Sequence, residues 1–443
     1  MKGSYEKVLN RLHEEIESEM FKEQSRMSEK DFTRNRIWKF TKLVMFQIYR
    51  ASKSLSVEIY GYLTRWFTEE STSKQALSQA RQKIKWEGYE HLNNEFVKSY
   101  YQEVAYKTYK GYLLVAADGT SYQAPAEKDI TEKFGIFQKG ICLIGCVKIY
   151  DVMNRIQIAS TFGSQGSEQG AYESEGSLFE KTLEKFKGLI NRAEQKVVMI
   201  GDRNYPCYYY FHELEKSGIN YLFRCSKTFC TEVQRFAKQG GQDEILEIEL
   251  KKYERRKETT AKRITDKSIN CLRVRCVALV LNTGEIAYLL TNISQTEMSG
   301  EELGKLYWYR WEIEKAYDVD KNKIELENFS CKTANGVLQE LYAGMVSFNI
   351  SQMVIAEAQE KLEEQMSEKA PTKYQYQINR SVAIGIVRQE LPVFLTKKIP
   401  LQEWFDNLVK EVIKHKEPVK PNRRFPKKRK NKHKYPLNRR PYI

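Results

Sequence analysis

Two aspartates at matched positions restrict the fold of this chain more than any other feature. Residues 112–117 form a short apolar run that ends at Asp118, and residues 197–200 form a second run followed by Gly201 and Asp202. Such runs predict buried strands, each of which delivers a carboxylate at its end. A single aspartate after a strand more often caps a helix or starts a turn, so the pairing of the two sites is the informative part.

The elements around these aspartates occur in a defined order. Strands and helices are expected at residues 112–117, 141–150, 155–162, 174–192, 197–200, 206–217 and 220–224. Three strands, a helix, a strand, a helix and a strand is the order of a ribonuclease-H-like α/β core. The first and fourth strands are neighbours in that fold, so Asp118 and Asp202 are expected to lie side by side.

A third acidic residue belongs to a helical pattern between residues 307 and 321. Tyr307, Arg310, Glu314 and Lys321 fall within about 60° of one helix face at about 100° per residue. This stripe combines a carboxylate, two cations and an aromatic hydroxyl where a core-facing helix would carry aliphatic residues. It suits metal-dependent chemistry on a nucleic acid. The alternative is a solvated face with an Arg310–Glu314 ion pair.

Asp118, Asp202 and Glu314 together supply carboxylates for divalent cations. Carboxylates that lie close together repel one another unless cations neutralise them. Two ions about 3.5–4 Å apart are the usual solution in such sites. Because hard oxygen ligands favour hard cations, two Mg²⁺ ions are expected, with Mn²⁺ as a substitute.

On these motifs the chain resembles the DDE transposases of bacterial insertion sequences, in the IS-four group of cut-and-paste enzymes. The resemblance rests on Asp118-Gly119-Thr120, Asp202-Arg203-Asn204-Tyr205 and the Tyr307, Arg310, Glu314 and Lys321 signature at the family's spacing. It extends to Ser78–Lys83 and covers about residues 30–360. Asn204 stands where the family more often has Gly, although Asn tolerates left-handed backbone geometry.

The resemblance implies an enzyme that acts on double-stranded DNA. It would bind the terminal inverted repeats of a transposon, cleave them by metal-dependent hydrolysis and transesterification through a hairpin, and join the 3′-hydroxyl ends to target DNA. Asp118, Asp202 and Glu314 would be the catalytic residues and the metal ligands. The resemblance also implies a homodimer in the synaptic complex.

The signature helix would supply the DNA contacts. The resemblance implies that Tyr307, Arg310 and Lys321 bind phosphates near the transposon end. Trp311 lies about 40° from Tyr307 on the same helix, so it could stack on a flipped base. Packing of Trp311 in the core is the alternative.

Positive charge is concentrated at the C-terminus. Residues 416–443 hold 12 Lys and Arg residues against one acidic residue, a local charge of +11 out of a total of +15. The same segment holds five of the ten prolines. This composition predicts a disordered or extended arm that contacts DNA phosphates nonspecifically. A solubility tail, or a segment that binds any polyanion, is the alternative.

Other function classes lack their signatures. The eight cysteines form no Cys-x2-Cys pair and the five histidines lie away from them, so zinc-binding spacing is absent. No signal-peptide pattern is present, and reduced thiols in a cytoplasmic protein are expected. No apolar run approaches the roughly 18–20 residues needed to span a bilayer.

The chain is expected to divide into six regions. These are a helical DNA-binding region at 1–104, the first part of the core at 105–225, a β-rich insertion at 226–300, completion of the core with the Glu314 helix at 301–335, a helical region at 336–415, and a basic disordered tail at 416–443. By the resemblance, the insertion would pack over the active site and the C-terminal helices would mediate dimerisation.

Two segments are candidates for further DNA contact. Ser73–Lys85 begins with capping residues and carries Lys74, Arg81, Lys83 and Lys85, so it is a candidate for a helix that lies against DNA; a solvated face is the alternative. Within the insertion, a basic stretch at 251–263 precedes strand patterns at 271–281 and 286–291, which are joined by Asn282-Thr283-Gly284-Glu285.

Three functions remain compatible with the sequence: an active transposase, a ribonuclease-H-like nuclease with another task, and a non-catalytic DNA-binding derivative. The intact set of three carboxylates argues against the third. Tyr307, Arg310 and Lys321, together with the β-rich insertion, argue against the second. Terminal inverted repeats flanking the coding region would favour the first.

Overall fold

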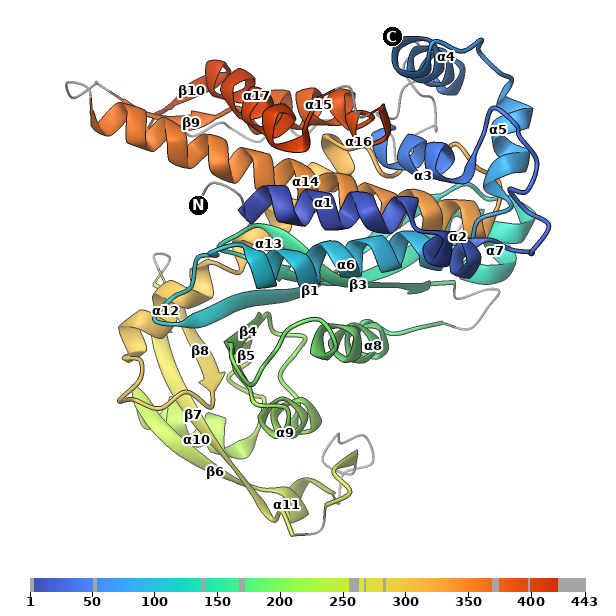
Figure 1. Ribbon diagram of the computed structural model, residues 1–443. Coiled ribbons are helices and arrows are strands. Elements are labelled where there is room, and N and C mark those ends of the chain that lie inside the picture. Colours follow the sequence, from blue (N-terminus) through green and yellow to red (C-terminus); the bar gives the residue numbers. More distant parts are fainter. Residues whose placement is uncertain are drawn as a thin grey trace.

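The computed structural model describes most of the chain. The described residues are 4–50, 54–137, 140–166, 172–254, 263–266, 268–281, 284–368, 374–396 and 399–420. Among them, one eight-stranded sheet has the strand order β3-β2-β1-β4-β5-β8-β7-β6 (Figure 1). Its strands are β1 (Tyr112–Ala124), β2 (Cys142–Asp151), β3 (Ile156–Ser164), β4 (Lys196–Gly201), β5 (Ile219–Cys225), β6 (Asp243–Glu249), β7 (Cys271–Val280) and β8 (Ile286–Thr291).

The helices surround this sheet. They are α1 (Ser4–Glu17), α2 (Glu19–Ser25), α3 (Phe40–Tyr49), α4 (Leu55–Phe67), α5 (Lys74–Arg81), α6 (Glu87–Glu103), α7 (Lys128–Phe134), α8 (Glu175–Lys187), α9 (Tyr208–Lys216), α10 (Thr231–Lys238), α11 (Leu250–Glu254), α12 (Gly300–Trp308), α13 (Trp311–Asn322), α14 (Ala334–Ser367), α15 (Arg380–Glu390), α16 (Val393–Thr396) and α17 (Leu401–Lys414). In Figure 1, α1, α6 and α14 lie above β1 and β3, whereas α8 and α9 lie below the sheet.

The pairing of the first five strands confirms the expected fold class. Strand β2 is antiparallel to both β1 and β3, whereas β4 is parallel to β1 and β5 is parallel to β4. The first and fourth strands are therefore neighbours. This is a mixed α/β sheet of the ribonuclease-H-like kind, flanked by helices.

Strand β1 is longer than the sequence indicates. We expected a strand that ends at Asp118, but pairing with β2 continues from Asp118↔Lys148 to Ala124↔Cys142. Pairing with β4, in contrast, stops at Ala116↔Ile200. Gly119 therefore forms no turn, and Asp118 lies within a strand whose neighbour on one side has just ended.

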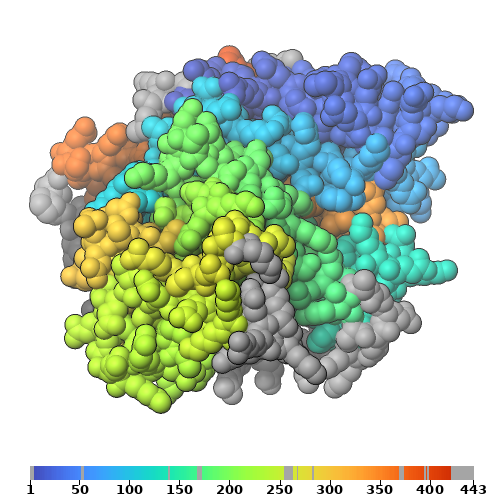
Figure 2. All heavy atoms as spheres, turned by 90° about the horizontal axis from the view of Figure 1, so that it is seen from below, coloured from blue at the N-terminus to red at the C-terminus, as the bar shows by residue number. Residues whose placement is uncertain are grey.

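The strands of the insertion continue the same sheet. Strand β8 pairs antiparallel with β5, from Leu222↔Thr291 to Cys225↔Tyr288. From below, the insertion adjoins the surface of α8 and α9 (Figure 2). Arg263 pairs with Glu180 of α8 at 2.7 Å, and its guanidinium lies 3.9 Å from the ring centroid of Tyr209 in α9. Residues 255–262 of the basic stretch and 282–283 of the hairpin turn lie outside the described residues.

A buried ionic cluster joins the N-terminal helices to α14. Glu340 of α14 pairs with Arg50 at 2.7 Å and with Arg81 at 2.9 Å, and Arg50 also pairs with Glu58 at 3.2 Å. Buried charges need such partners because desolvation of an unpaired charge is costly. We call Arg50, Glu58, Arg81 and Glu340 the buried ionic cluster.

The candidate DNA-binding helix is largely engaged within the protein. Ser73 caps α5 as expected, accepting a hydrogen bond from the backbone of Ala76 at 3.2 Å. Arg81, however, belongs to the buried ionic cluster, Lys83 lies 3.6 Å from Asp31, and Lys85 donates to a backbone carbonyl. Of the four basic residues proposed for DNA contact, only Lys74 is fully exposed.

The C-terminal basic segment begins as a strand. Residues Lys416–Val419 form β10, which pairs antiparallel with β9 (Gln375–Ile378). The start of the expected disordered tail at residue 416 is therefore wrong, because these four residues belong to a two-stranded antiparallel sheet. Residues 421–443, which hold most of the basic charge, lie outside the described residues. No helix in the described part of the chain is long and apolar enough to cross a membrane.

Candidate active site

Asp118 and Asp202 meet at one edge of the sheet. The last parallel pair between β1 and β4 is Ala116↔Ile200, and each aspartate stands two residues further along its strand direction. Burial raises the pKa of Asp118 to about 7; the charge of Arg310 opposes this rise and the charge of Asp202 adds to it. The two carboxylates are thus close enough to interact, which agrees with the neighbouring positions expected from the sequence.

Glu175 is a third carboxylate at this edge, and the sequence did not single it out. The hydroxyl of Tyr205 donates to Glu175 Oε1 at 3.0 Å. A Cβ atom on Gly119 would lie 2.6 Å from the carboxyl carbon of Glu175, so glycine is needed for this close approach. Burial raises the pKa of Glu175, the Tyr205 hydroxyl lowers it, and the charge of Asp202 raises it further.

Topology explains why Glu175 lies there. Strand β3 runs in the same direction as β1 because both are antiparallel to β2. The chain therefore leaves β3 at the edge where β1 and β4 carry their aspartates, and α8 begins there with Glu175. Strand order alone could have identified it, but an acidic residue in the first turn of a helix is also the common choice for the helix dipole.

Glu314 is held by Arg310 at the start of α13. The expected continuous helix is interrupted, since α12 ends at Trp308 and α13 begins at Trp311. Arg310 Nη1 lies 3.0 Å from Glu314 Oε1, so the ion pair considered as the alternative is present. The face is not simply solvated, however, because Arg310 is buried and its charge lowers the pKa of Asp118. Arg310 therefore links Glu314 to the aspartate edge.

Helix α13 is fastened to β1 at Asp118 and at the residues that follow it. The Tyr317 hydroxyl donates to the backbone oxygen of Asp118 at 2.6 Å. Lys321 Nζ donates to Thr120 Oγ1 and to the Ser121 carbonyl, both at 2.8 Å. Burial lowers the pKa of Lys321. In this structure Lys321 holds the helix against the strand, a role that the helix-face pattern did not reveal.

A second, fully buried contact supports the same helix. Lys148, which is opposite Asp118 in the β1–β2 register, pairs with Asp320 of α13 at 2.5 Å. The amide of Gln157 donates to Asp320 Oδ1 at 3.0 Å. Because both charges are buried and satisfied, this contact fixes the position of α13 relative to the strand that carries Asp118.

Aromatic side chains surround the break between α12 and α13. Trp308, Tyr309 and Trp311 are 49%, 39% and 44% exposed, so core packing of Trp311 is wrong. The guanidinium of Arg310 lies 4.6 Å from the Trp311 ring centroid and 5.8 Å from that of Tyr307, which is itself buried. Trp308 and Tyr309 were not expected as surface residues, although the run Tyr-Trp-Tyr-Arg-Trp at 307–311 is unusually aromatic.

The site is crowded with negative charge but is not a preformed metal cage. In the part of the chain that the structure describes, no three His, Cys, Asp or Glu side chains are grouped so that they could hold a metal ion. Asp118, Asp202 and Glu175 interact electrostatically, and Glu314 is turned towards Arg310.

Comparisons with known proteins find similarity to transposases. Residues 169–350 match the family model described as "Transposase DDE domain", a segment that includes Asp202 and Glu314 and begins after Asp118. "Transposase InsG for insertion sequence element IS4" of Escherichia coli (strain K12) is 21% identical over 292 residues, which is 62% of this chain and 59% of the relative. The chain thus matches less than two thirds of that relative's length.

A likeness to a solved structure extends over most of the chain. The cryo-EM structure of the piggyBac transposase synaptic complex with hairpin DNA superimposes with a TM-score of 0.43 and 10% identity, covering 93% of this chain and 82% of that chain.

Proposed function

We propose that this chain, which contains a transposase DDE domain, excises a mobile DNA element and joins it to target DNA. The observation that carries the proposal is the parallel pairing of β1 and β4, which sets Asp118 and Asp202 side by side next to Arg310 and Glu314. The reaction class is phosphoryl transfer on double-stranded DNA. The substrates are the terminal inverted repeats of the element and a target duplex.

The donor set fits divalent cations. Asp118, Asp202 and Glu314 would hold two Mg²⁺ ions, with Mn²⁺ as a substitute, because carboxylate oxygens are the ligands that these ions prefer. A buried carboxyl with a pKa near 7 beside two other acids is electrostatically unfavourable when ionised, and a nearby cation would relieve this. Bound ions of this kind activate a water or a 3′-hydroxyl and stabilise the leaving oxygen.

The protein's own groups would prepare the site for DNA. Glu314 would have to release Arg310 in order to face the aspartates, and Arg310 would then be free to bind a phosphate. Tyr317 would keep the backbone at Asp118 in place throughout. The exposed rings of Trp308, Tyr309 and Trp311 would stack on an unpaired base near the cleavage point.

The finer steps rest on the resemblance to the IS-four group. A hairpin intermediate requires a strand end to turn back on its complement, and an exposed aromatic cluster beside a buried arginine suits the displaced base and its phosphate. Tyr307, Arg310 and Lys321 are the proposed DNA-contacting residues of this step, with Arg310 the most accessible to rearrangement. A homodimer is proposed for the synaptic complex.

Cleavage assays on DNA carrying the element's ends test the proposal. Asp118→Asn, Asp202→Asn and Glu314→Gln should each abolish nicking while DNA affinity in a mobility-shift assay stays within about twofold. Glu301→Gln in α12, where an exposed Glu301–Lys305 pair spans 2.7 Å, is the matched control and should cleave normally. Normal cleavage by any of the three site variants would contradict the proposal.

A further inference from the structure

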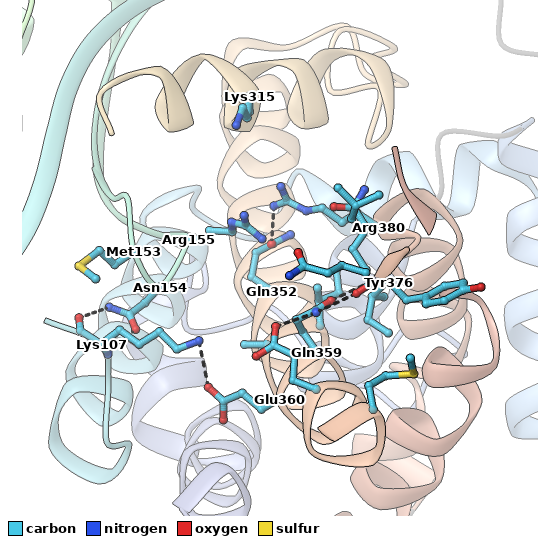
Figure 3. Close-up of a pocket in the computed structure, with 18 of the residues that line it drawn as sticks. Lys107, Met153, Asn154, Arg155, Lys315, Gln352, Gln359, Glu360, Tyr376 and Arg380 are labelled. Atoms are coloured by element: carbon cyan, nitrogen blue, oxygen red, sulfur yellow. Dashed lines mark hydrogen bonds and ion pairs between the residues drawn. The ribbon is translucent and has the colours of Figure 1, made fainter. Parts of the chain in front are cut away.

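A basic pocket lies beside α13, at Lys315. It has a volume of about 900 Å³ and is formed by α1, α13, α14, β9 and the turn between β2 and β3 (Figure 3). Lys315 reaches it from α13, Arg155 from the β2–β3 turn, and Arg380 from the start of α15. Gln352 of α14 also lines the wall. We call this cavity the α14 pocket, defined by Arg155, Lys315, Gln352 and Arg380.

The cations of the α14 pocket are under-compensated. Among the described residues, no carboxylate forms an ion pair with Arg380, whose Nη2 donates instead to Gln352 Oε1 at 2.7 Å. Burial and then the charge of Arg155 lower the pKa of Arg380, as two facing cations require. Arg155 shares one acid, Glu312, with Lys315, at an Arg155 Nε to Glu312 Oε2 distance of 3.7 Å.

The acids of the pocket wall have partners of their own. Glu360 pairs with Lys107 at 3.1 Å, and Glu363 accepts a hydrogen bond from Gln359 at 2.8 Å. Among the described residues, neither of these acids forms an ion pair with Arg380. The charge of Glu312 raises the pKa of Arg380, but this single acid also pairs with Arg155 and Lys315. Three cations that share one acid, with Arg380 largely buried, are unfavourable, and an anion in the pocket would offset that cost.

Two further hydrogen-bond donors also favour an anionic ligand in this pocket. Gln352 is 2% exposed, and its amide nitrogen has no hydrogen-bond partner; neither has Arg380 Nε. The pocket also lies at the N-terminus of the 11-residue helix α15, which Asn379 caps at the backbone of Val382. Helix N-termini favour anions, so side chains and helix dipole agree in sign.

We propose that the α14 pocket binds a phosphate group through Arg155 and Arg380, and that in the assembled complex this phosphate belongs to the DNA backbone. The second part rests on the proposed function. Lys315 and Glu314 are consecutive on α13 and diverge by about 100°, so one helix separates the pocket from the candidate active site. A DNA strand that crosses α13 can therefore engage both, and phosphate contacts of this kind fix the position of a duplex.

Phosphate alone tests the first part without any need for cleavage. The full chain is titrated with pyrophosphate in metal-free buffer, with thermal unfolding and calorimetry as readouts. Wild type, Asp118→Asn and the exposed control Arg273→Gln should bind equally, whereas Arg155→Asn and Arg380→Gln should weaken binding at least tenfold. Arg155 has a φ of 62°, and asparagine is the residue that best retains that backbone. Equal binding by all variants would overturn the pocket assignment.

DNA binding tests the second part. The salt dependence of affinity for random-sequence duplex should fall by about one unit of slope for each cation removed in Arg155→Asn and Lys315→Gln, and remain unchanged in Arg273→Gln. If Arg380→Gln does not fold, the Arg155 and Lys315 variants are used in both the pyrophosphate titration and the DNA-binding experiment. Loss of pyrophosphate binding with an unchanged DNA salt slope would assign the pocket to a free phosphate and overturn the DNA assignment.

Discussion

The buried ionic cluster and the aspartate edge use the same residue types in opposite ways. In the cluster, Glu340 is shared by Arg50 and Arg81 within 2.9 Å, and Arg50 also holds Glu58, so positive and negative charges alternate. At the aspartate edge, Asp118, Asp202 and Glu175 interact with one another, and Arg310, whose charge acts on Asp118, is already paired with Glu314. Matched charges stabilise a fold, whereas an unmatched excess of one sign marks a place where a ligand completes the balance.

The largest loss of stability is expected in the buried ionic cluster, where the charges are matched. Glu340→Ala leaves the guanidinium groups of Arg50 and Arg81 buried without their shared acid, which should cost about 3–5 kcal/mol of unfolding free energy. Urea denaturation measures this directly. Glu301→Gln, which removes an exposed i,i+4 pair, should cost less than about 0.5 kcal/mol. Equal losses in both variants would remove the distinction between the cluster and an ordinary surface pair.

At the aspartate edge, removal of a charge should stabilise the fold instead of destabilising it, and the size of this effect should depend on pH. The pKa of Asp118 rises from 3.8 to about 7 on folding, so the native state holds this proton more tightly than the unfolded state does. Stability should therefore fall as pH rises from about 4 through 7 in metal-free buffer, by at most about 4 kcal/mol at about 1.4 kcal/mol per pKa unit. Asp118→Asn should lose this pH dependence and be more stable than wild type at pH 8. A constant difference between pH 5 and pH 8 would contradict the account.

The α13 anchor should give an intermediate effect. Lys321→Met removes the donors to Thr120 and Ser121 and should destabilise the protein by about 1–3 kcal/mol. Arg310→Ala should leave metal affinity near normal and slow the conversion of nicked DNA to hairpin and excised product. Gel assays that resolve the three products separate these outcomes. Normal stability of the Lys321 variant would show that its contacts with β1 are incidental.

The smallest effect on stability is expected at the exposed aromatic cluster. Trp311→Ala should lower the unfolding free energy by no more than about 1 kcal/mol, because Trp311 is 44% exposed. Binding of DNA with an unpaired base at the cleavage point should weaken by about 1–3 kcal/mol, while fully paired DNA should bind as before. A fluorescent base analogue at that position reports the stacking. Equal loss on both DNAs would argue for a general packing role.

Much of this arrangement follows from the sequence. Apolar runs before Asp118 and Asp202, together with the order of elements between them, predict neighbouring strands, and β1 and β4 are paired in parallel. The insertion strands near 271–281 and 286–291 are present as β7 and β8. Local patterns identify strands well because burial imposes a period on side chains that is visible in the sequence.

What the sequence did not reveal depends on contacts between distant segments. The extension of β1 to Ala124 is imposed by β2, and Glu175 reaches the site because β3 ends there. A helix-face pattern groups Arg310 with Lys321, yet Lys321 is bonded to β1 and Arg81 is buried against α14. Long basic side chains can end in solvent, on DNA or on a distant carbonyl, and only the tertiary structure decides which.

Proton release on metal binding is the most direct test of the central claim that the unmatched carboxylates bind cations. Mn²⁺ is titrated into wild type, Glu314→Gln and Asp118→Asn at pH 6.5, in buffers with different ionisation enthalpies. Since the pKa of Asp118 is about 7, wild type should release about three quarters of a proton as the ion binds. Glu314→Gln should bind more weakly but still release it, and Asp118→Asn should release none. Identical affinity and proton release in all three proteins would contradict the account.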